Sequence, residues 1–413
     1  MNPFAVVIVA ALLVETVVRR VADWLDCQRA RQPLPPPLGD VEDAETRKRS
    51  ADYARACFAS DTLASGVFLA ALLLFWFAGG FNWLDQALRS AIENPVGRGT
   101  AYILILLAAR RVVTLPFDVY NTFWIEARFG FNRTTPITFI LDTIKVVVLG
   151  AVLGGAVLAV VLAFFEYAGP LAWLYAWGAV AALSILLHFL APAVILPLFN
   201  RFEPLPQGEL RSRLESLLDR ADFPAGRLSV VDGSRRTTKS NAFFTGFGAN
   251  RRIALYDTLV ENHSPAEIEA VLAHEIGHCK MGHVRQRVVL GILHTGVLLA
   301  LFSLLIGNRL LHDAFLVQEM SVYAALVFFS LLYSPVEFAL GLALNALFRK
   351  QEYQADRYVG AIDAAPDALA AALKRLSVDQ LSNLTPHPLS VAINDSHPPL
   401  KARIDALQSE VKA

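Results

Sequence analysis

The sequence predicts an all-α polytopic membrane protein of about seven transmembrane helices, with a small α+β domain between the fifth and sixth. Hydrophobic residues make up 55% of the 413 residues and charged residues only 18%, which is too apolar for an ordinary soluble protein. Several apolar stretches are long enough to cross ~30 Å of hydrocarbon. Residues 201–286 interrupt this pattern with the short-range periodicities of a soluble domain.

Five of the apolar stretches lie before residue 200. The first covers residues 3–25, and we interpret it as a span because it shows neither the charged start nor the small-residue cleavage site of a signal peptide. Residues 26–60 are polar and contain Arg47-Lys48-Arg49, so we place them outside the membrane. The next four spans are expected at about 62–84, 100–117, 138–168 and 171–198.

The soluble domain carries helix and strand signals in close succession. Glu209–Asp219 has the spacing of an amphipathic helix, and Leu228–Val231 that of a short strand. Ala242–Gly246 and Ile253–Tyr256 predict a hairpin turned by Gly248-Ala249-Asn250. An exposed strand of this hairpin could pair with an extended peptide.

A helix with two histidines ends this domain. Ser264, with Pro265 after it and Glu267 three residues on, predicts a capping box at the helix start. His274 and His278 then lie four residues apart on one helical face, where both imidazoles can reach one Zn²⁺, and Glu275 stands beside the position of a metal-bound water. This H-E-x-x-H pattern is typical of metalloproteases, although a helix can match it by chance.

The rest of the chain is expected to cross the membrane twice more. The histidine helix should continue directly into a sixth span at about 287–307, and a seventh follows at about 321–347, interrupted by Ser334-Pro335. From Arg349 onward the chain is polar and mostly helical. We therefore divide the chain into four segments, 1–200, 201–286, 287–348 and 349–413.

The distribution of basic residues predicts the orientation. Lys and Arg gather in the loops after spans one, three and five and are sparse in the other loops. Since cytoplasmic loops carry the excess of Lys and Arg, the N-terminus should lie outside and the soluble domain and C-terminus in the cytoplasm. Two crossings separate His278 from residues after 348, so both lie on the same face.

A catalytic zinc usually takes three protein ligands and a water. Glu352, on the helix that leaves the seventh span on the correct face, is our candidate third ligand, and Asp356 one turn later could orient a ligand. Taken alone, a glutamate such as Glu352 is more often a solvated helix residue, but the need for a third ligand and the shared membrane face reverse that preference. His283 should point away from the ligand face at helical pitch, and we do not expect it to bind metal.

Other features exclude some functions. The formal net charge is zero, so no nucleic-acid partner is indicated. Cys27, Cys57 and Cys279 have no framework spacing, and we interpret them as reduced thiols that do not bind the metal.

Five motifs in this order carry a resemblance to a known family, the type I CAAX prenyl proteases, which are integral-membrane zinc metallopeptidases. The similarity runs along nearly the whole chain, and its carriers are Asn241-Ala242-Phe243-Phe244 with Gly246-Phe247, Arg252-Ile253-Ala254-Leu255-Tyr256-Asp257-Thr258-Leu259, His274-Glu275-Ile276-Gly277-His278, Glu352-Tyr353-Gln354-Ala355-Asp356, and Ser396-His397-Pro398-Pro399-Leu400.

The resemblance implies roles for particular residues. His274, His278 and Glu352 would bind one Zn²⁺ per chain, and Glu275 would be the general base. Asn241 with the adjoining Ala242 and Phe243 would hold the substrate backbone, and His397 and Arg403 would stabilise the transition state. It also implies seven helices around a polar chamber. Two alternatives stay open: Ser396-His397-Pro398-Pro399 could simply begin the last helix, and Asn241 could be a turn residue.

Two departures point to a bacterial-type member in an inner (plasma) membrane with its active site facing the cytoplasm. The link at about 308–320 is short, and the C-terminus offers no retrieval signal. Peptide or protein substrates, prenylated or membrane-embedded, are expected, and quality-control proteolysis without a prenyl requirement is a second hypothesis. A transporter or scaffold with a structural zinc is the third, and the three-ligand set with a neighbouring carboxylate argues against it.

Overall fold

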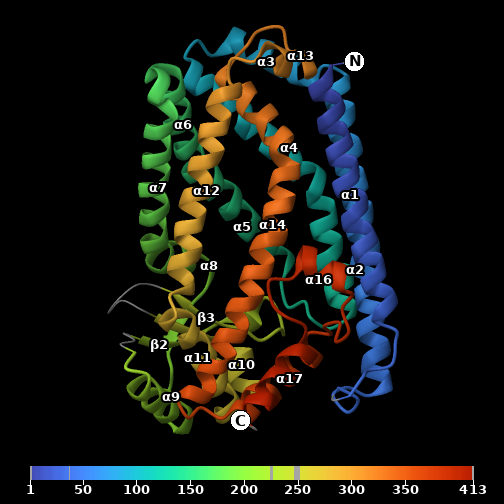
Figure 1. Cartoon of the computed structure of the whole chain (residues 1–413), viewed down its shortest axis with the longest axis vertical. Coiled ribbons are helices and arrows are strands. Elements are labelled where there is room, and N and C mark those ends of the chain that lie inside the picture. Colours follow the sequence, from blue (N-terminus) through green and yellow to red (C-terminus); the bar gives the residue numbers. More distant parts are fainter. Residues whose placement is uncertain (1, 37, 224–226, 246–251, 412–413) are drawn as a thin grey trace.

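A bundle of long helices stands on a small sheet domain (Figure 1). The computed structural model describes residues 2–36, 38–223, 227–245 and 252–411. The N-terminus lies at the end of the bundle away from the sheet, beside α3 (Gly80–Ala91) and α13 (Arg309–Ala314), and the C-terminus lies at the sheet end (Figure 1).

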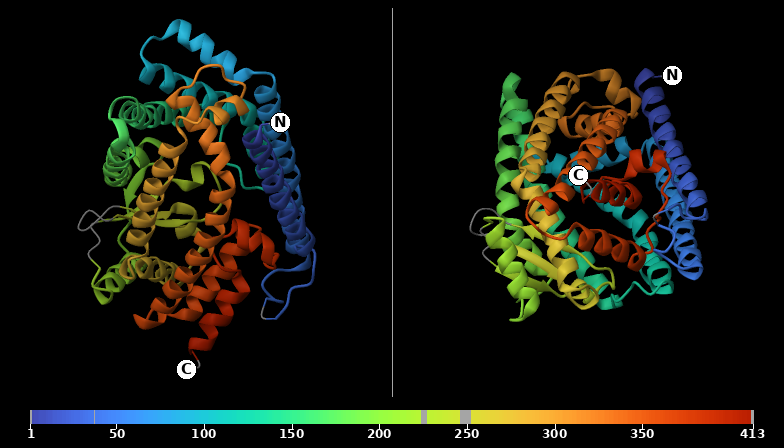
Figure 2. Two further views of the ribbon diagram at one scale, coloured as in Figure 1. Left: turned by 45° about the horizontal axis from the view of Figure 1, so that its top comes forward. Right: turned by 60° about the horizontal axis from the view of Figure 1, so that its bottom comes forward.

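Within the described residues, six helical segments are long and apolar enough to cross a membrane. They are α2 (Ala44–Phe77), α4 (Pro95–Tyr120) with the π-helical Asn121–Glu126, α5 (Pro136–Leu149) with α6 (Gly155–Tyr167), α7 (Ala172–Leu190) with α8 (Leu196–Phe199), α12 (His283–Leu305) and α14 (Val322–Ala361). Helix α1 (Pro3–Arg29) is also long, but its apolar part contains Glu15, Arg19 and Arg20. It contacts α2 and α14, and it runs beside α2 in both views of Figure 2.

Three expected helix bounds were wrong. α2 begins at Ala44, well inside the polar segment, because Asp43 caps it by accepting a hydrogen bond from Thr46 N, and it ends at Phe77. α14 runs unbroken through Pro335, a residue that transmembrane helices tolerate. The histidine helix α11 (Pro265–Lys280) does not continue into the membrane. It stops before Gly282, whose φ of 72° is left-handed, and α12 starts at His283.

The sheet has four strands in the order β1-β2-β4-β3. β1 (Phe202–Pro204) was not expected, whereas β2 (Arg227–Val231) was. β3 (Ala242–Thr245) and β4 (Arg252–Tyr256) form the expected antiparallel hairpin, and its proposed turn, Gly248-Ala249-Asn250, lies outside the described residues. β4 pairs with both β2 and β3, so Ile253–Tyr256 cannot accept a peptide strand. β3 is an edge strand and can.

The core of the sheet domain holds α11 in place. Ile268, Leu272 and Ile276 project from one face of α11 into a cluster with leucines of α9 (Glu209–Arg220) and strand residues of β4. Each such buried side chain contributes about 1.5–3 kcal/mol. The opposite face of α11 carries the two histidines, and the capping box at Ser264 and Glu267 is formed as predicted.

Three helices complete the chain. They are α15 (Pro366–Asp379), α16 (Pro388–Asn394) and α17 (Leu400–Val411), and α17 packs beside α14 and α15 at the sheet end (Figure 2). The segment Ser396-His397-Pro398-Pro399 does lead into the last helix, as one of our two interpretations had it.

Candidate metal centre and active site

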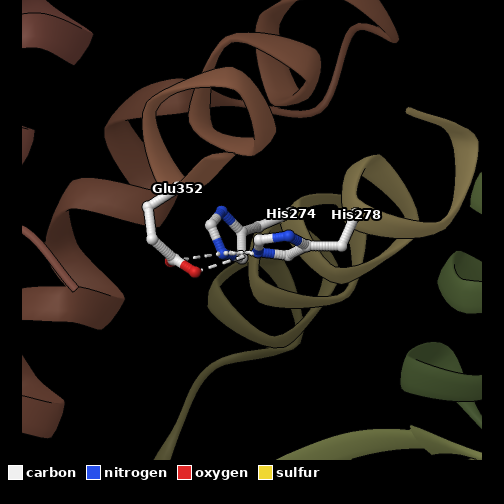
Figure 3. A group of neighbouring side chains, drawn as sticks. All are labelled: His274, His278 and Glu352. Carbon is white, nitrogen blue, oxygen red and sulfur yellow. Dashed lines mark hydrogen bonds and ion pairs between the residues drawn. The ribbon is translucent and has the colours of Figure 1, made fainter. Parts of the chain in front are cut away.

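His274, His278 and Glu352 converge on one point between α11 and α14 (Figure 3). Nε2 of His274 lies 3.2 Å from Nε2 of His278, and these two nitrogens lie 3.3 Å and 3.2 Å from Oε2 and Oε1 of Glu352. Among the described residues, this is the one group of three or more His, Cys, Asp or Glu residues that could hold a metal ion.

The spacing of these atoms fits a tetrahedral Zn²⁺. Ligand atoms about 2.0–2.1 Å from zinc at a tetrahedral angle lie ~3.3 Å apart. The two imidazole nitrogens lie at this separation from each other, and each lies at this separation from one oxygen of the Glu352 carboxylate. Oε2 of Glu352 is buried and has no hydrogen-bond partner among the described residues. A buried carboxylate oxygen without a partner is costly, and a cation between the three side chains would satisfy it.

A close contact between two helices brings the ligands together. Gly277, between the two histidines, faces α14, and a Cβ atom at this position would lie 3.0 Å from Cβ of Tyr358 and 3.2 Å from Cα of Ala355. Only glycine permits this approach without a shift, so the glycine in H-E-I-G-H sets the distance between α11 and Glu352.

Asp356 and Arg403 lie behind His274. Oδ1 of Asp356 is 2.9 Å from Nδ1 of His274, and the guanidinium of Arg403 donates two hydrogen bonds to the same carboxylate, at 2.6 and 2.9 Å. Arg403 is only 7% exposed. Burial disfavours the charged imidazole, but the neighbouring carboxylates of Asp356 and Glu352 outweigh burial and raise the pKa of His274. The environment of His274 thus favours positive charge.

His278 has a different partner, which we did not expect. Nδ1 of His278 lies 3.0 Å from Nδ1 of His283, and Nε2 of His283 lies 3.0 Å from Oε1 of Gln354. Helical pitch had placed His283 away from the ligand face. The break at Gly282 overturns that argument, because α12 sets off in a new direction and returns His283 to the back of His278. Gly282 itself was the sequence signal for this.

An open pocket of about 230 Å³ lies beside the ligands, and His283 is among the residues that line it. Glu275 and His397 line it together with Phe243 of the edge strand and Arg287 of α12. Burial raises the pKa of the Glu275 carboxyl, as a base near neutral pH requires. Nε2 of His397 is 3.5 Å from Oε1 of Glu352. Arg287 was not among the residues singled out from the sequence, since a lone arginine near a span carries no signal.

Asn241 and Ala242 lie beside this pocket rather than in its lining. Asn241 is exposed at the start of β3, its Oδ1 accepts a hydrogen bond from the N–H of Ala242, and its carbonyl oxygen accepts one from Tyr256. The side chain therefore caps the first N–H of the edge strand.

Two protein-family models together match nearly the whole chain. A family model described as "CAAX prenyl protease N-terminal, five membrane helices" matches residues 23–201, and one described as "Peptidase family M48" matches residues 204–411. The chain belongs to peptidase family M48. The CAAX prenyl protease 1 homolog of Oryza sativa subsp. japonica is 35% identical over 383 residues, covering 91% of this chain and 90% of the rice protein.

Two further M48 relatives support the assignment. CAAX prenyl protease 1 of Saccharomyces cerevisiae is 33% identical over 402 residues, covering 91% of this chain and 88% of the yeast protein. The crystal structure of S. mikatae Ste24p superposes with a TM-score of 0.91 at 32% identity and covers 98% of this chain and 99% of that one.

These matches confirm the predicted family, fold class and activity. The protein is a multi-pass membrane metalloendopeptidase similar to the CAAX prenyl proteases, and its family implies a metal, generally zinc. The expectation of a bacterial-type member finds no support, because the relatives compared here are eukaryotic.

Proposed function

We propose that this M48 peptidase holds one Zn²⁺ between His274, His278 and Glu352 and uses Glu275 as its general base. The observation that carries the proposal is the convergence of the two imidazole nitrogens and the Glu352 carboxylate, whose nearest separations are 3.2–3.3 Å, beside a pocket that Glu275 lines. A structural zinc would take a fourth protein ligand, usually cysteine. None of the three cysteines belongs to the group, which argues against the scaffold hypothesis.

We assign a different role in catalysis to each residue around the pocket. Zinc, when bound, polarises the scissile carbonyl and lowers the pKa of water. Glu275 accepts the proton of the attacking water and delivers it to the leaving amine. His397, at the edge of the pocket, is placed to donate a hydrogen bond to the developing oxyanion, a role that is worth about 3–4 kcal/mol where it has been measured. Arg403 is buried against Asp356 and acts on His274 through it.

We propose that an extended peptide pairs with β3. β3 is the edge of the sheet, and Phe243 on this strand lines the pocket that holds Glu275. Backbone pairing would place the scissile bond beside the ligands through main-chain hydrogen bonds, which do not depend on the side chains of the substrate. Asn241, Ala242 and Phe243 would thus contact the substrate backbone.

Substrates of two kinds fit this site. The names of the relatives favour prenylated proteins cleaved near the C-terminus. Quality-control cleavage of membrane-embedded proteins is the alternative. We further propose that the bilayer surrounds the six candidate spans and α1, that the helices enclose a polar chamber, and that the active site faces the cytoplasm, as the Lys and Arg distribution indicates. The division at residues 200, 286 and 348 and the bacterial plasma membrane are hypotheses from the sequence.

One experiment tests both the metal centre and the substrate preference. The purified protein in detergent is assayed on a farnesylated CAAX peptide and on the same peptide without the lipid, with zinc measured on the same samples. We expect one zinc per chain and cleavage of the farnesylated peptide. Equal cleavage of both peptides would favour the quality-control function, and full activity in a Glu352→Ala variant would refute the metal centre.

A further inference from the structure

Each histidine ligand is backed by a hydrogen-bond partner on its second ring nitrogen. Asp356 backs His274, whereas His278 is backed by a chain of two neutral side chains, His283 and Gln354. We propose that His283 and Gln354 are positioning residues that set the tautomer and orientation of His278 and thereby the metal affinity of the site. This inference rests on the proposed metal centre at His274, His278 and Glu352.

The hydrogen-bond chain has one arrangement that is consistent with metal binding. Nε2 of His278 faces the other two ligands, so this nitrogen must be unprotonated to bind a cation. The proton of a neutral His278 then sits on Nδ1 and is donated to Nδ1 of His283, 3.0 Å away. Since that nitrogen accepts, the proton of His283 is on Nε2 and is donated to Oε1 of Gln354, 3.0 Å away.

The direction in which the protons are donated along these hydrogen bonds depends on which group of the Gln354 side-chain amide faces His283. If Gln354 presented its NH₂ group instead, His283 Nε2 would have to accept, and His283 would donate from Nδ1 to Nδ1 of His278. That would place the proton of His278 on Nε2, the nitrogen that faces the ligands. The orientation in the structure, with the carbonyl oxygen of Gln354 toward His283, is the one that matches the metal-binding tautomer of His278.

His283 is not a fourth ligand. It contacts Nδ1 of His278, the nitrogen that points away from His274 and Glu352. His283 is only 2% exposed, and it lies at the first position of α12, directly after the left-handed Gly282. Gln354 lies two residues after Glu352 on α14. The hydrogen bonds through His283 thus connect α11 with α14 by way of the start of α12. They leave the ring of His278 little freedom to rotate.

The test uses variants that keep shape and change hydrogen bonding. His283→Phe keeps an aromatic ring without an acceptor, and Gln354→Met keeps the length of the side chain without its amide oxygen. His283→Asn restores an oxygen close to the place of Nδ1. The control is His263→Phe, which alters another buried histidine of the sheet domain whose ring nitrogens have no hydrogen-bond partner among the described residues.

Two readouts besides activity are measured on the full-length protein. They are the zinc affinity, from competition with a chelator, and the visible spectrum of the cobalt-substituted protein. We expect His283→Phe to weaken zinc binding by about 10–100-fold and to shift the cobalt spectrum. Gln354→Met should have a smaller effect in the same direction, since it acts through His283. His283→Asn should recover most of the affinity, and His263→Phe should leave it unchanged.

Two outcomes in the His283 variants overturn the inference. One is zinc affinity within twofold of the wild type in His283→Phe with an unchanged cobalt spectrum. The other is an equal loss in His283→Phe and His283→Asn, which would mean that packing and not the hydrogen bond matters. Where His283→Phe does not fold, Gln354→Met carries the test, and wild-type affinity in that variant overturns the inference as well. A failure of the metal centre itself is distinguishable, because Glu352→Ala would then retain zinc.

Discussion

Gly277→Ala tests whether the contact between α11 and α14 sets the geometry of the metal centre. The new Cβ would lie 3.0 Å from Cβ of Tyr358 and 3.2 Å from Cα of Ala355. Carbon atoms prefer separations of about 3.5–4.0 Å, so the helices must move apart by ~0.3–0.5 Å. Metal sites tolerate changes of about 0.2 Å in ligand distance, so the shift is large enough to disturb zinc binding.

The energetic effects of Gly277→Ala oppose each other. Alanine favours the helix by about 1 kcal/mol over glycine, whereas overpacking costs about 1–3 kcal/mol. A net cost of ~1.4 kcal/mol borne by the ligands corresponds to a tenfold loss of zinc affinity. We therefore expect zinc binding about tenfold weaker and a lower temperature of thermal unfolding in the presence of zinc.

Two control variants isolate the contact. Gly291 in α12 and Gly341 in α14 also lie within helices, but an added Cβ would meet no atom within 4 Å at either position. Gly291→Ala and Gly341→Ala should keep wild-type zinc affinity in the same chelator competition. Wild-type zinc affinity and thermal stability in Gly277→Ala would refute the reasoning, because α11 and α14 would then accommodate a Cβ atom at this position without moving apart.

Three further predictions follow from the site and its surroundings. Glu275→Gln should retain zinc and lose about 10²–10⁴-fold in kcat, as peptide cleavage with parallel metal analysis would show. Asp356→Asn should weaken zinc binding by about 10–100-fold in chelator competition, because the carboxylate no longer orients His274. Burial, then repulsion from Asp26, raises the pKa of Asp395 to about 6. The folded state therefore binds a proton at Asp395 more tightly than the unfolded state does. Protonation of Asp395 stabilises the fold at low pH, and this stabilisation is lost as pH rises from about 4 through 6. Asp395→Asn should remove this loss in thermal unfolding at pH 4.5 and 7.

Local sequence signals were sufficient for most elements and for the grouping of the three candidate ligands. The capping box at Ser264 fixed the start of α11, and the spacing of His274 and His278 placed both rings on one face. Glu352 was predictable although 74 residues separate it from His278 (352 minus 278). Two membrane crossings return the chain to the same side, and a third ligand was chemically required.

Contacts that depend on a change of chain direction were not predictable in this way. A helical periodicity places His283 opposite the ligands only if the helix continues past Gly282, and it does not. The strand order is likewise a tertiary property: β4 looks exposed in the sequence, but β2 from an earlier segment pairs with its free edge. The role of Arg403 also depended on packing, since its guanidinium lies against Asp356.

Helix α14 connects the metal centre to the membrane. It runs for 40 residues without a break and carries Glu352, Gln354 and Asp356 within its last three turns. One ligand, the partner of His274 and the last member of the hydrogen-bond chain behind His278 therefore belong to a single helix that begins at the far end of the bundle. Loss of zinc would remove the ion that joins Glu352 on α14 to the two imidazoles on α11, and this would weaken the contact between the two helices. Metal binding is thus coupled to the packing of the sheet domain against the membrane helices.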